Sequence, residues 1–362
     1  MNIINCHSHT FTIKHVPNRF LPFRLVSILK PAILRKPLGW ILRNLLPFTD
    51  RDILDRYINF LEITAHKTQE ETFIRVKGYY PSNTKFIVLP MDMEFMFAGK
   101  VKETYEIQLK ELLHLKNLYP NQVLPFIAVD PRRNTIFDMV KNYMEKHSFS
   151  GIKIYPRLGF YPNDARLLKM YAYAQSKNIP ILSHCSRGGV YTKKITPEML
   201  KHPIRGIVKK TKPKDFSHYF TEPQNYVPIL EKFPNLKICL AHFGGSTAWN
   251  SYLDTPWNPQ NENEEPSWVA QIVTMMEKYD NLYTDISYTL FHSDRYFPLL
   301  AIFLENKKIK DRIMFGSDYY MVEREKISER EVSLKIRHAL GEEKFKLIAE
   351  TNVNTFLNMN HD

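Results

Sequence analysis

The sequence predicts an α/β fold of the (β/α)8 class, the TIM barrel, on two observations. Eight short apolar runs recur along the 362 residues, and the stretches between them carry apolar residues at intervals of three and four. Strands that alternate with such amphipathic helices are typical of βαβ units and a parallel sheet. Eight strands suit a closed barrel, and a doubly wound open sheet is the alternative.

The expected strands are short and evenly distributed. They are residues 2–7, 85–92, 123–130, 151–156, 179–184, 236–242, 281–287 and 312–318. The clearest helical patterns cover residues 103–119, 136–147, 165–178 and 266–279. The length alone suggests two domains, but barrels with inserted loops reach this size. We therefore expect residues 1–362 to form a single domain.

Three connections are too long for plain crossovers, namely residues 10–84, 185–235 and 243–265. Each follows a strand, so in a barrel each lies at the C-terminal face, where active sites are built. The sequence thus predicts a helical insertion after strand 1, which forms a cap within 10–84, and long loops after strands 5 and 6.

The formal net charge of +12 favours anionic partners without selecting among them. Residues 14–49 hold seven lysines or arginines and no acidic residue, and prolines 31 and 37 interrupt their apolar runs. Such a segment cannot form a spanning helix. We favour a cap or a subunit contact, and a peripheral membrane contact through 14–49 is the alternative. No nucleic-acid-binding signature is present, so no nucleic-acid partner is expected.

Three cysteines occur, Cys6, Cys185 and Cys239, each inside an apolar run. An odd number without regular spacing argues against a disulfide framework and for a reducing compartment. The first residues show no signal-peptide pattern. We therefore expect a cytoplasmic protein.

Two histidines of the opening "NCHSHT" follow the first expected strand. Side chains two apart in a strand point the same way, so His7 and His9 can face the barrel axis together. The same alternation predicts that Ile4 and Cys6 pack outward against helices.

Three further polar residues stand at the ends of other expected strands. His184 ends the fifth strand, His242 the sixth and Asp318 the eighth. Imidazole and carboxylate ligands suit Zn²⁺ or a similar metal, with a position left open for water. The strand ends together predict a metal site at the barrel mouth.

Five motifs resemble the amidohydrolase superfamily, and within it the amidohydrolase-2 branch of metal-dependent barrels, which includes hydrolases and decarboxylases. They are "CHSHT", "GIKIYPRLGFYPND", "IPILSHCSRGG", "LAHFGG" and "MFGSDYY". They occur in order over nearly the whole chain, and the closing "ETNVNTFLNM" resembles the helical end of the family. The resemblance implies a metal-dependent enzyme.

Carried onto this sequence, the resemblance implies roles for five residues. His7, His9, His184 and Asp318 would hold the metal, and Asp318 would also accept a proton from water. His242 would orient or polarise the substrate or the attacking water. One Zn²⁺ per chain is expected, with Mn²⁺ or a binuclear site as alternatives.

Lys153 admits two interpretations under the resemblance. In related binuclear enzymes a carbamylated lysine at the end of the fourth strand bridges two metals. We favour one metal, with the Lys153 ammonium binding a substrate carboxylate.

Other polar residues after strands four, five and seven are candidates for contacts around the site. Arg157 and Arg187 could clamp a carboxylate with two hydrogen bonds, and Tyr155 shares the face of Lys153. Asp285 is a candidate partner for a ligand histidine. A solvated or structural role is the equal alternative for each arginine, and for Asp285 a structural role is favoured.

The expected function is a metal-dependent hydrolase acting on a C–N or C–O bond of a small anionic amide, lactone or ester. A non-oxidative decarboxylase of a small aromatic acid could use the same metal site and is the alternative. The expected partner is a small molecule, and a homodimer is a further expectation, since dimers are common among enzymes of this kind.

Overall fold

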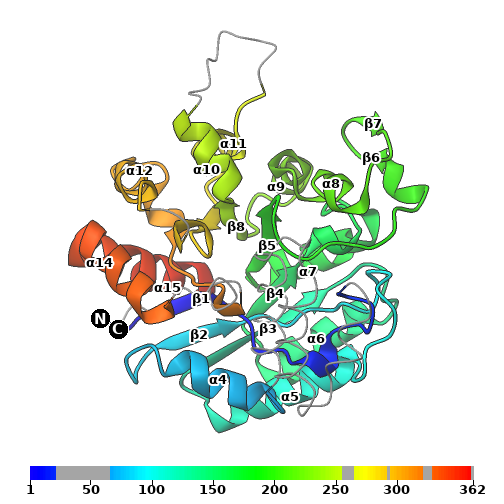
Figure 1. Ribbon diagram of the computed structural model, residues 1–362, viewed down its shortest axis with the longest axis horizontal. Coiled ribbons are helices and arrows are strands. Elements are labelled where there is room, and N and C mark those ends of the chain that lie inside the picture. Colours follow the sequence, from blue (N-terminus) through cyan, green and yellow to red (C-terminus); the bar gives the residue numbers. More distant parts are fainter. Residues whose placement is uncertain (22–65, 255–264, 292–293, 321–327, 360–362) are drawn as a thin grey trace, which may run out of the picture.

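The protein is described by a computed structural model over residues 1–21, 66–254, 265–291, 294–320 and 328–359. Eight parallel strands form a nearly closed barrel with helices around it (Figure 1). In their order around the sheet, they are β1 (Ile4–Ser8), β2 (Lys85–Val88), β3 (Val123–Val129), β4 (Gly151–Ile154), β5 (Ile181–Ser186), β8 (Ile238–Gly244), β9 (Leu282–Asp285) and β10 (Ile313–Met314). The prediction of a (β/α)8 barrel is confirmed.

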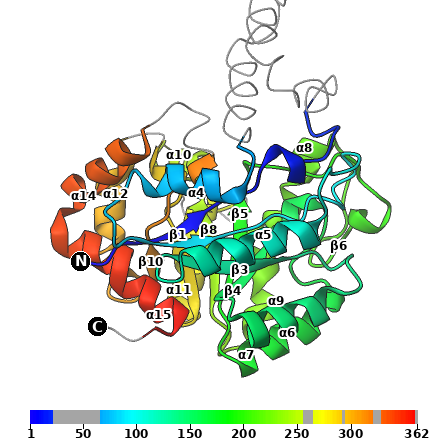
Figure 2. The same ribbon diagram turned by 90° about the horizontal axis from the view of Figure 1, so that it is seen from below.

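Helices surround these strands, as the view from below also shows (Figure 2). The α-helices are α4 (Gln69–Lys77), α5 (Tyr105–Leu118), α6 (Ile136–His147), α7 (Leu168–Ser176), α8 (Pro213–Phe216), α9 (Val227–Lys232), α10 (Ser246–Asp254), α11 (Trp268–Lys278), α12 (Tyr296–Phe303), α14 (Glu329–Lys346) and α15 (Asn352–Leu357). A π-helical turn, Leu347–Thr351, joins α14 to α15.

Short 3₁₀ turns complete the connections. They are Ile13–His15, Pro156–Leu158, Ala165–Leu167, Glu198–Leu200, Tyr219–Thr221, Pro223–Tyr226, Thr289–Phe291 and Lys310–Arg312. A small antiparallel hairpin, β6 (Lys201–His202) and β7 (Gly206–Ile207), projects from the connection after β5 (Figure 1).

Two apolar clusters hold the fold together. The larger one lies between the strands and the helices that cover them. The smaller one fills the barrel interior with residues from seven of the eight strands and closes its lower end with Val353 and Phe356 of α15. Gly151 leaves room for this filling, because a Cβ there would come within 2.4 Å of the Phe126 ring.

The expectation that Ile4 and Cys6 pack outward is wrong. Both belong to the cluster inside the barrel. The pairing of β1 with β2 shifts between Asn5 and Ser8, so strict alternation does not hold along β1. This irregularity lets Cys6 point inward while the next residue, His7, still reaches polar groups at the barrel mouth.

The long connections are only partly covered by the described residues. Residues 22–65, which include most of the predicted cap within 10–84 and most of the basic segment 14–49, lie outside the described residues. The described flanks contain the Ile13–His15 turn and α4. The connection expected over 243–265 begins instead with a regular helix, α10.

The three cysteines are buried and form no disulfide. Within the described ranges, every helix is too short or too polar to cross a membrane.

Candidate metal centre

The ends of β1, β5, β8 and β10 bring the predicted ligands to one cavity of about 50 Å³. Its walls are His7, His9, Phe11, Met91, Tyr155, His184, Ser186, Gly188, Gly189, Val190, His242, Tyr288, Asp318 and Tyr320. The five predicted residues His7, His9, His184, His242 and Asp318 all appear in this lining. They are between 1% and 6% exposed, so the cavity is largely shielded from bulk water.

Three of the four predicted ligands present their donor atoms to one another. His7, His9 and Asp318 each offer a ligand atom, and these atoms lie within 4.8 Å of one another. The Nε2 atom of His9 is 3.6 Å from Oδ1 of Asp318. The backbone N–H of Asp318 donates to the carbonyl of His7 at 2.8 Å, which joins the end of β10 to β1.

Hydrogen bonds fix which ring nitrogen of each β1 histidine faces the cavity. The Nδ1–H of His7 donates to Oδ2 of Asp285 at 3.0 Å, and the Nδ1–H of His9 donates to the carbonyl of Leu89 at 2.7 Å. In a neutral imidazole the other nitrogen then carries the lone pair. Both Nε2 atoms are therefore available as metal ligands.

His184 lies in the same cavity but is turned toward His242. Its Nδ1 is 2.9 Å from Nε2 of His242, while its Nε2–H donates to the carbonyl of Gly188 at 3.0 Å. His242 in turn donates from Nδ1 to the carbonyl of Ser287 at 3.1 Å. The lone pairs of His184 Nδ1 and His242 Nε2 consequently face each other, and a nearby cation would stabilise this arrangement. This donor set fits a bound metal ion.

Asp285 connects His7, His242 and Ser287 through its carboxylate, although the sequence favours only a structural role for it. Its carboxylate accepts from His7 Nδ1, from the backbone N–H of His242 at 3.0 Å and from Ser287. Despite complete burial, its pKa is lowered, because its interactions with His7 and His242 and the hydrogen bond from Ser287 together outweigh the desolvation. The position of "YTDIS" at the end of a predicted strand was the signal that could have identified it.

Burial keeps the site histidines neutral. It lowers the pKa of His9 to about 3 and that of His242 to about 4, and it holds the pKa values of His7 and His184 well below their usual range. The charge of Lys153 adds to this effect for His7 and His9. Neutral imidazoles are the form that binds metals.

Lys153 lies fully buried beside the ligand group. Its Nζ is 3.5 Å from Nε2 of His7, and burial lowers its pKa to about 8 against the opposing pull of Asp285 and Asp318. Tyr155, two residues later, stacks on His184 with ring centroids 4.2 Å apart. Its hydroxyl accepts from the backbone N–H of Val190 at 3.1 Å.

The two predicted arginines lie outside the lining of the cavity. Arg157 is 1% exposed, donates to the carbonyls of Val190 and Lys214, and has an Nη1 without a hydrogen-bond partner among the described residues. Arg187 packs its guanidinium 4.3 Å from the Trp268 ring centroid. Of the two, Arg157 thus retains the capacity to bind an anion.

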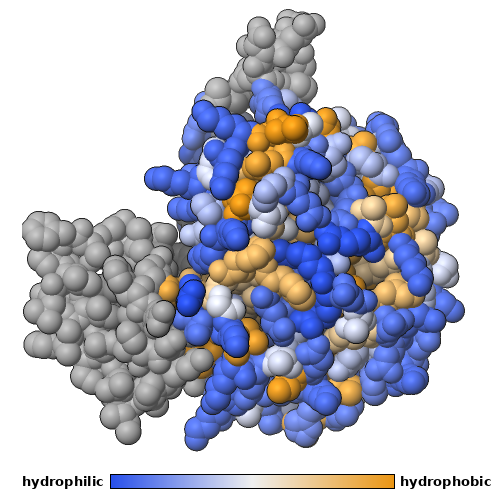
Figure 3. Space-filling model, turned by 90° about the vertical axis from the view of Figure 1, so that its right-hand side faces the viewer, coloured by the Kyte–Doolittle hydropathy of each residue, from blue (hydrophilic) through white to orange (hydrophobic). Residues whose placement is uncertain are grey.

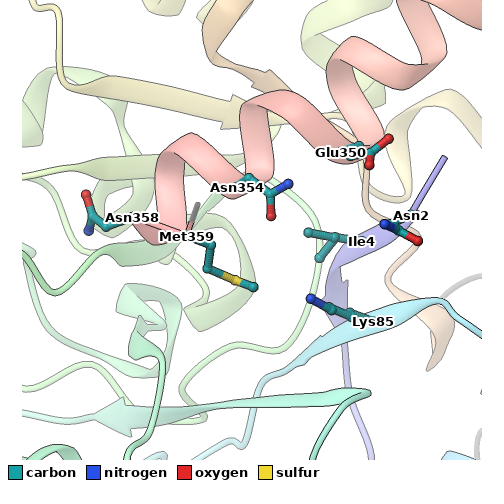
Figure 4. Close-up of a pocket in the computed structure, with 7 residues that line it drawn as sticks. All are labelled: Asn2, Ile4, Lys85, Glu350, Asn354, Asn358 and Met359. Atoms are coloured by element: carbon teal, nitrogen blue, oxygen red, sulfur yellow. The ribbon is translucent and has the colours of Figure 1, made fainter. Parts of the chain in front are cut away.

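A larger cavity of about 410 Å³ opens at the opposite end of the barrel, beside the beginnings of β1 and β2 (Figure 4). It is lined by Asn2, Ile4, Lys85, Glu350, Asn354, Asn358 and Met359. These residues include no histidine and a single carboxylate, so this cavity lacks the donors of a metal centre.

A third polar cluster joins His15 to Glu103 and Glu111. The Nδ1 of His15 accepts the backbone N–H of Thr12 at 3.0 Å, so the ring proton is on Nε2. That nitrogen lies 3.6 and 3.7 Å from the two carboxylates. It therefore faces them as a donor and has no lone pair for a metal.

A family model for amidohydrolases matches residues 70–357. The chain belongs to the amidohydrolase family. The predicted membership is therefore confirmed over most of the sequence. None of the curated proteins matches this amidohydrolase-family chain.

Solved structures show the same fold at low sequence identity. An uncharacterised TIM-barrel protein from Bordetella bronchiseptica has a TM-score of 0.55 at 14% identity, with 99% of each chain covered. A 5-carboxyvanillate decarboxylase from Sphingomonas paucimobilis has a TM-score of 0.56 at 11% identity, again over 99% of each chain. A dihydroxybenzoic acid decarboxylase from Polaromonas, solved with manganese and an inhibitor, has a TM-score of 0.56 at 12% identity and covers 100% of this chain and 98% of its own.

Proposed function

We propose that this amidohydrolase-family protein is a metal-dependent hydrolase of a small anionic amide, lactone or ester. The convergence of His7, His9 and Asp318 within 4.8 Å, on the cavity that His184 and His242 also line, carries the proposal. The unprotonated Nε2 atoms of His7 and His9 have lost their hydration on burial, and a bound cation would offset that cost.

His7, His9, His184 and Asp318 would hold one divalent ion. Nitrogen and oxygen donors favour Zn²⁺, and the manganese of the Polaromonas relative makes Mn²⁺ the second candidate. When bound, the ion supplies Lewis acidity and lowers the pKa of water toward neutrality. Asp285 would keep His7 oriented by accepting its Nδ1–H.

Two residues of this chain would handle the proton. Asp318 presents a carboxylate to the cavity and would accept the proton of the attacking water. His242 donates from Nδ1 to Ser287, so its Nε2 is unprotonated and would orient that water by accepting a hydrogen bond.

Three cationic side chains would select an anionic substrate. Lys153 is the nearest, because its ammonium lies 3.5 Å from a ligand histidine. Arg157 would contribute its unpartnered Nη1, and Arg187 would act farther out from its position on Trp268. The Tyr155 hydroxyl, held against Val190, would position the substrate beside His184.

A non-oxidative decarboxylase is the second candidate, and the aromatic lining of the cavity favours it. Phe11 and Tyr320 stack with centroids 4.5 Å apart, and Tyr155 and Tyr288 form other walls. Such walls suit a flat aromatic acid. Two solved relatives in the same fold are decarboxylases of aromatic acids.

A substrate panel separates the two reactions. The metal-loaded protein is incubated with lactones, esters and N-acyl amino acids, and separately with carboxyl-labelled hydroxybenzoates. The proposal predicts hydrolysis products and no labelled CO₂. Release of labelled CO₂ without hydrolysis would establish the decarboxylase instead, and failure of both reactions at every metal loading would count against an enzyme.

Variants connect the activity to the site. Asp318→Asn should reduce turnover by about 10²-fold or more, since proton acceptance is lost. The matched control is Asp130→Asn, a buried aspartate whose partner Arg132 lies outside the cavity lining. Equal losses in both variants would show that a general folding defect, not the chemistry of Asp318, is responsible.

A further inference from the structure

The hairpin β6–β7 exposes two isoleucines, Ile204 within its turn and Ile207 in β7. Ile207 is 83% exposed and Ile204 47%, whereas the next residue, Val208, is buried. Figure 3 faces the side of the molecule that carries the hairpin in Figure 1, and hydrophobic atoms lie exposed near the top of that face among hydrophilic ones. Exposed β-branched apolar side chains on a projecting hairpin are typical of contact surfaces.

The hairpin is held in a fixed shape that keeps these isoleucines outward. The Nδ1 of buried His202 accepts the backbone N–H groups of Ile204 and Arg205, both at 3.1 Å. Glu222 then binds His202 at 3.2 Å and Arg205 at 3.1 Å. The two isoleucines are therefore exposed on a hairpin whose turn is held in place by these contacts.

Positively charged residues are frequent in the hairpin and in the segment that follows it. Residues 201–214 contain six lysines or arginines and no acidic residue. Arg205 is paired with Glu222 and Glu265. The other five, all exposed, make no ion pair among the described residues and are Lys201, Lys209, Lys210, Lys212 and Lys214. The surface thus combines two exposed isoleucines with unneutralised ammonium groups, and we name residues 201–214 the basic hairpin surface.

We propose that the basic hairpin surface docks the protein onto an anionic phospholipid membrane. Aliphatic side chains enter the boundary between head groups and acyl chains, while lysines bind the acidic head groups. Charge complementarity requires an anionic partner. The exposed aliphatic side chains favour a bilayer over nucleic acid, for which aromatic and arginine side chains are the usual contacts. The proposal is independent of the chemistry at the metal centre.

The hairpin belongs to a connection that also contributes residues to the candidate metal centre. The connection after β5 that carries it also supplies Gly188, Gly189 and Val190 to the catalytic cavity. In the same connection, the carbonyl of Lys214 accepts from Arg157. A bilayer held at the hairpin would therefore contact the same connection that contributes residues to the site.

Vesicle co-sedimentation of the full-length protein tests the proposal. The probes are vesicles of phosphatidylcholine with about one third phosphatidylserine and vesicles of phosphatidylcholine alone, each at about 0.05, 0.15 and 0.5 M salt. We expect binding to the anionic vesicles, weakening as salt rises, and at least tenfold weaker binding to the neutral ones.

Three variants assign the binding to the hairpin. Ile204→Ser with Ile207→Ser should weaken binding at least tenfold and retain its salt dependence. Lys209→Ser, Lys210→Ser and Lys212→Ser together should weaken it and flatten the salt dependence. Ile302→Ser, at an exposed isoleucine of α12, is the matched control and should bind as the wild type does. Thermal unfolding confirms that each variant is folded.

Three outcomes would overturn the proposal. The first is no binding to anionic vesicles at low salt. The second is binding that the hairpin variants leave unchanged, which would place the contact elsewhere on this basic chain. The third is tight binding of a DNA duplex or RNA strand that competes with vesicles and depends on the lysines but not on the isoleucines.

Discussion

At the scale of single residues, the site depends on groups that hold its histidines as much as on the histidines themselves. Strand-end position in the sequence was sufficient to predict that His7, His9, His184, His242 and Asp318 gather in one cavity, because the carboxyl ends of parallel strands meet at one face. The role of Asp285 in holding His7 and His242 could not be predicted from its position at a strand end. It depends on three hydrogen bonds that only the folded chain shows.

Asp285→Asn should lower metal affinity by about 10- to 100-fold. The amide cannot match the carboxylate as an acceptor for both His7 and the His242 backbone, so the ring of His7 loses its fixed tautomer. Titration with a fluorescent zinc competitor measures this. Asp130→Asn serves as the control and should bind as the wild type; an unchanged affinity in Asp285→Asn would mean that His7 is not a ligand.

At the scale of elements, the eight strands and the helices α5, α6, α7 and α11 lie where the sequence predicts them, whereas α14 was not among the predicted helices. The period-2 and 3.6-residue patterns reflect which side chains are buried, and this burial determines where strands and helices form. The departures occur where local backbone geometry overrides the pattern. The pairing of β1 with β2 shifts between Asn5 and Ser8, and His242 and Asp318 have φ values of 70° and 58°. Left-handed residues of this kind concentrate at functional sites and leave no hydrophobic signature.

The two glycines after β5 allow a sharp test of the loop beside the site. A Cβ on Gly189 would lie 2.3 Å from the Tyr155 hydroxyl and 3.0 Å from Cε1 of His184, and its φ is +93°. Gly189→Ala should therefore displace His184 and weaken metal binding about tenfold or more. In Gly188→Ala, the nearest atom to the Cβ is Ser186 Oγ at 3.8 Å, so binding should be preserved. Equal metal affinities in the two variants would show that His184 takes no part.

At the scale of the whole molecule, the ends of the chain meet to close the barrel. The backbone N–H of Cys6 donates to the carbonyl of Phe315 at 3.0 Å. The side chain of Asn5 donates to Ser317 at 2.8 Å and accepts from its backbone N–H at 3.1 Å. These contacts join β1 to the segment that follows β10, and both carry candidate metal ligands. We call this junction the β1–β10 seam, and we expect it to support both the stability of the fold and the geometry of the site. Sequence periodicity carries no information on such pairing between residues 312 positions apart.

Removing the Asn5 side chain should destabilise the protein strongly. Asn5→Ala leaves buried partners on Ser317 unsatisfied and should cost about 2–4 kcal/mol in the free energy of unfolding. Denaturant titration measures this cost. Asn83→Ala, which removes an exposed bond to Asn2, should cost less than about 0.5 kcal/mol. A small effect at Asn5 would mean that the β1–β10 seam does not limit stability.

Acid should destabilise the metal-free protein through its buried histidines. His242 has a pKa of about 4 in the folded state, against about 6.5 when unfolded. Between these values the unfolded chain binds more protons, so stability rises with pH from about 4 to 6.5. His242 accounts for up to about 3 kcal/mol of this rise. His242→Asn should show a shallower dependence in the same window, and identical slopes in the two proteins would contradict the assignment.

The most direct test of the account is the metal content of the protein, purified without chelators or a metal-affinity tag and measured by elemental mass spectrometry. The site predicts about one zinc or manganese per chain, lost in His9→Asn and in Asp318→Asn but retained in Asp130→Asn. About two metals per chain would indicate a binuclear centre with Lys153 as a bridge. No stoichiometric metal, even after incubation with Zn²⁺ or Mn²⁺, would contradict the central claim.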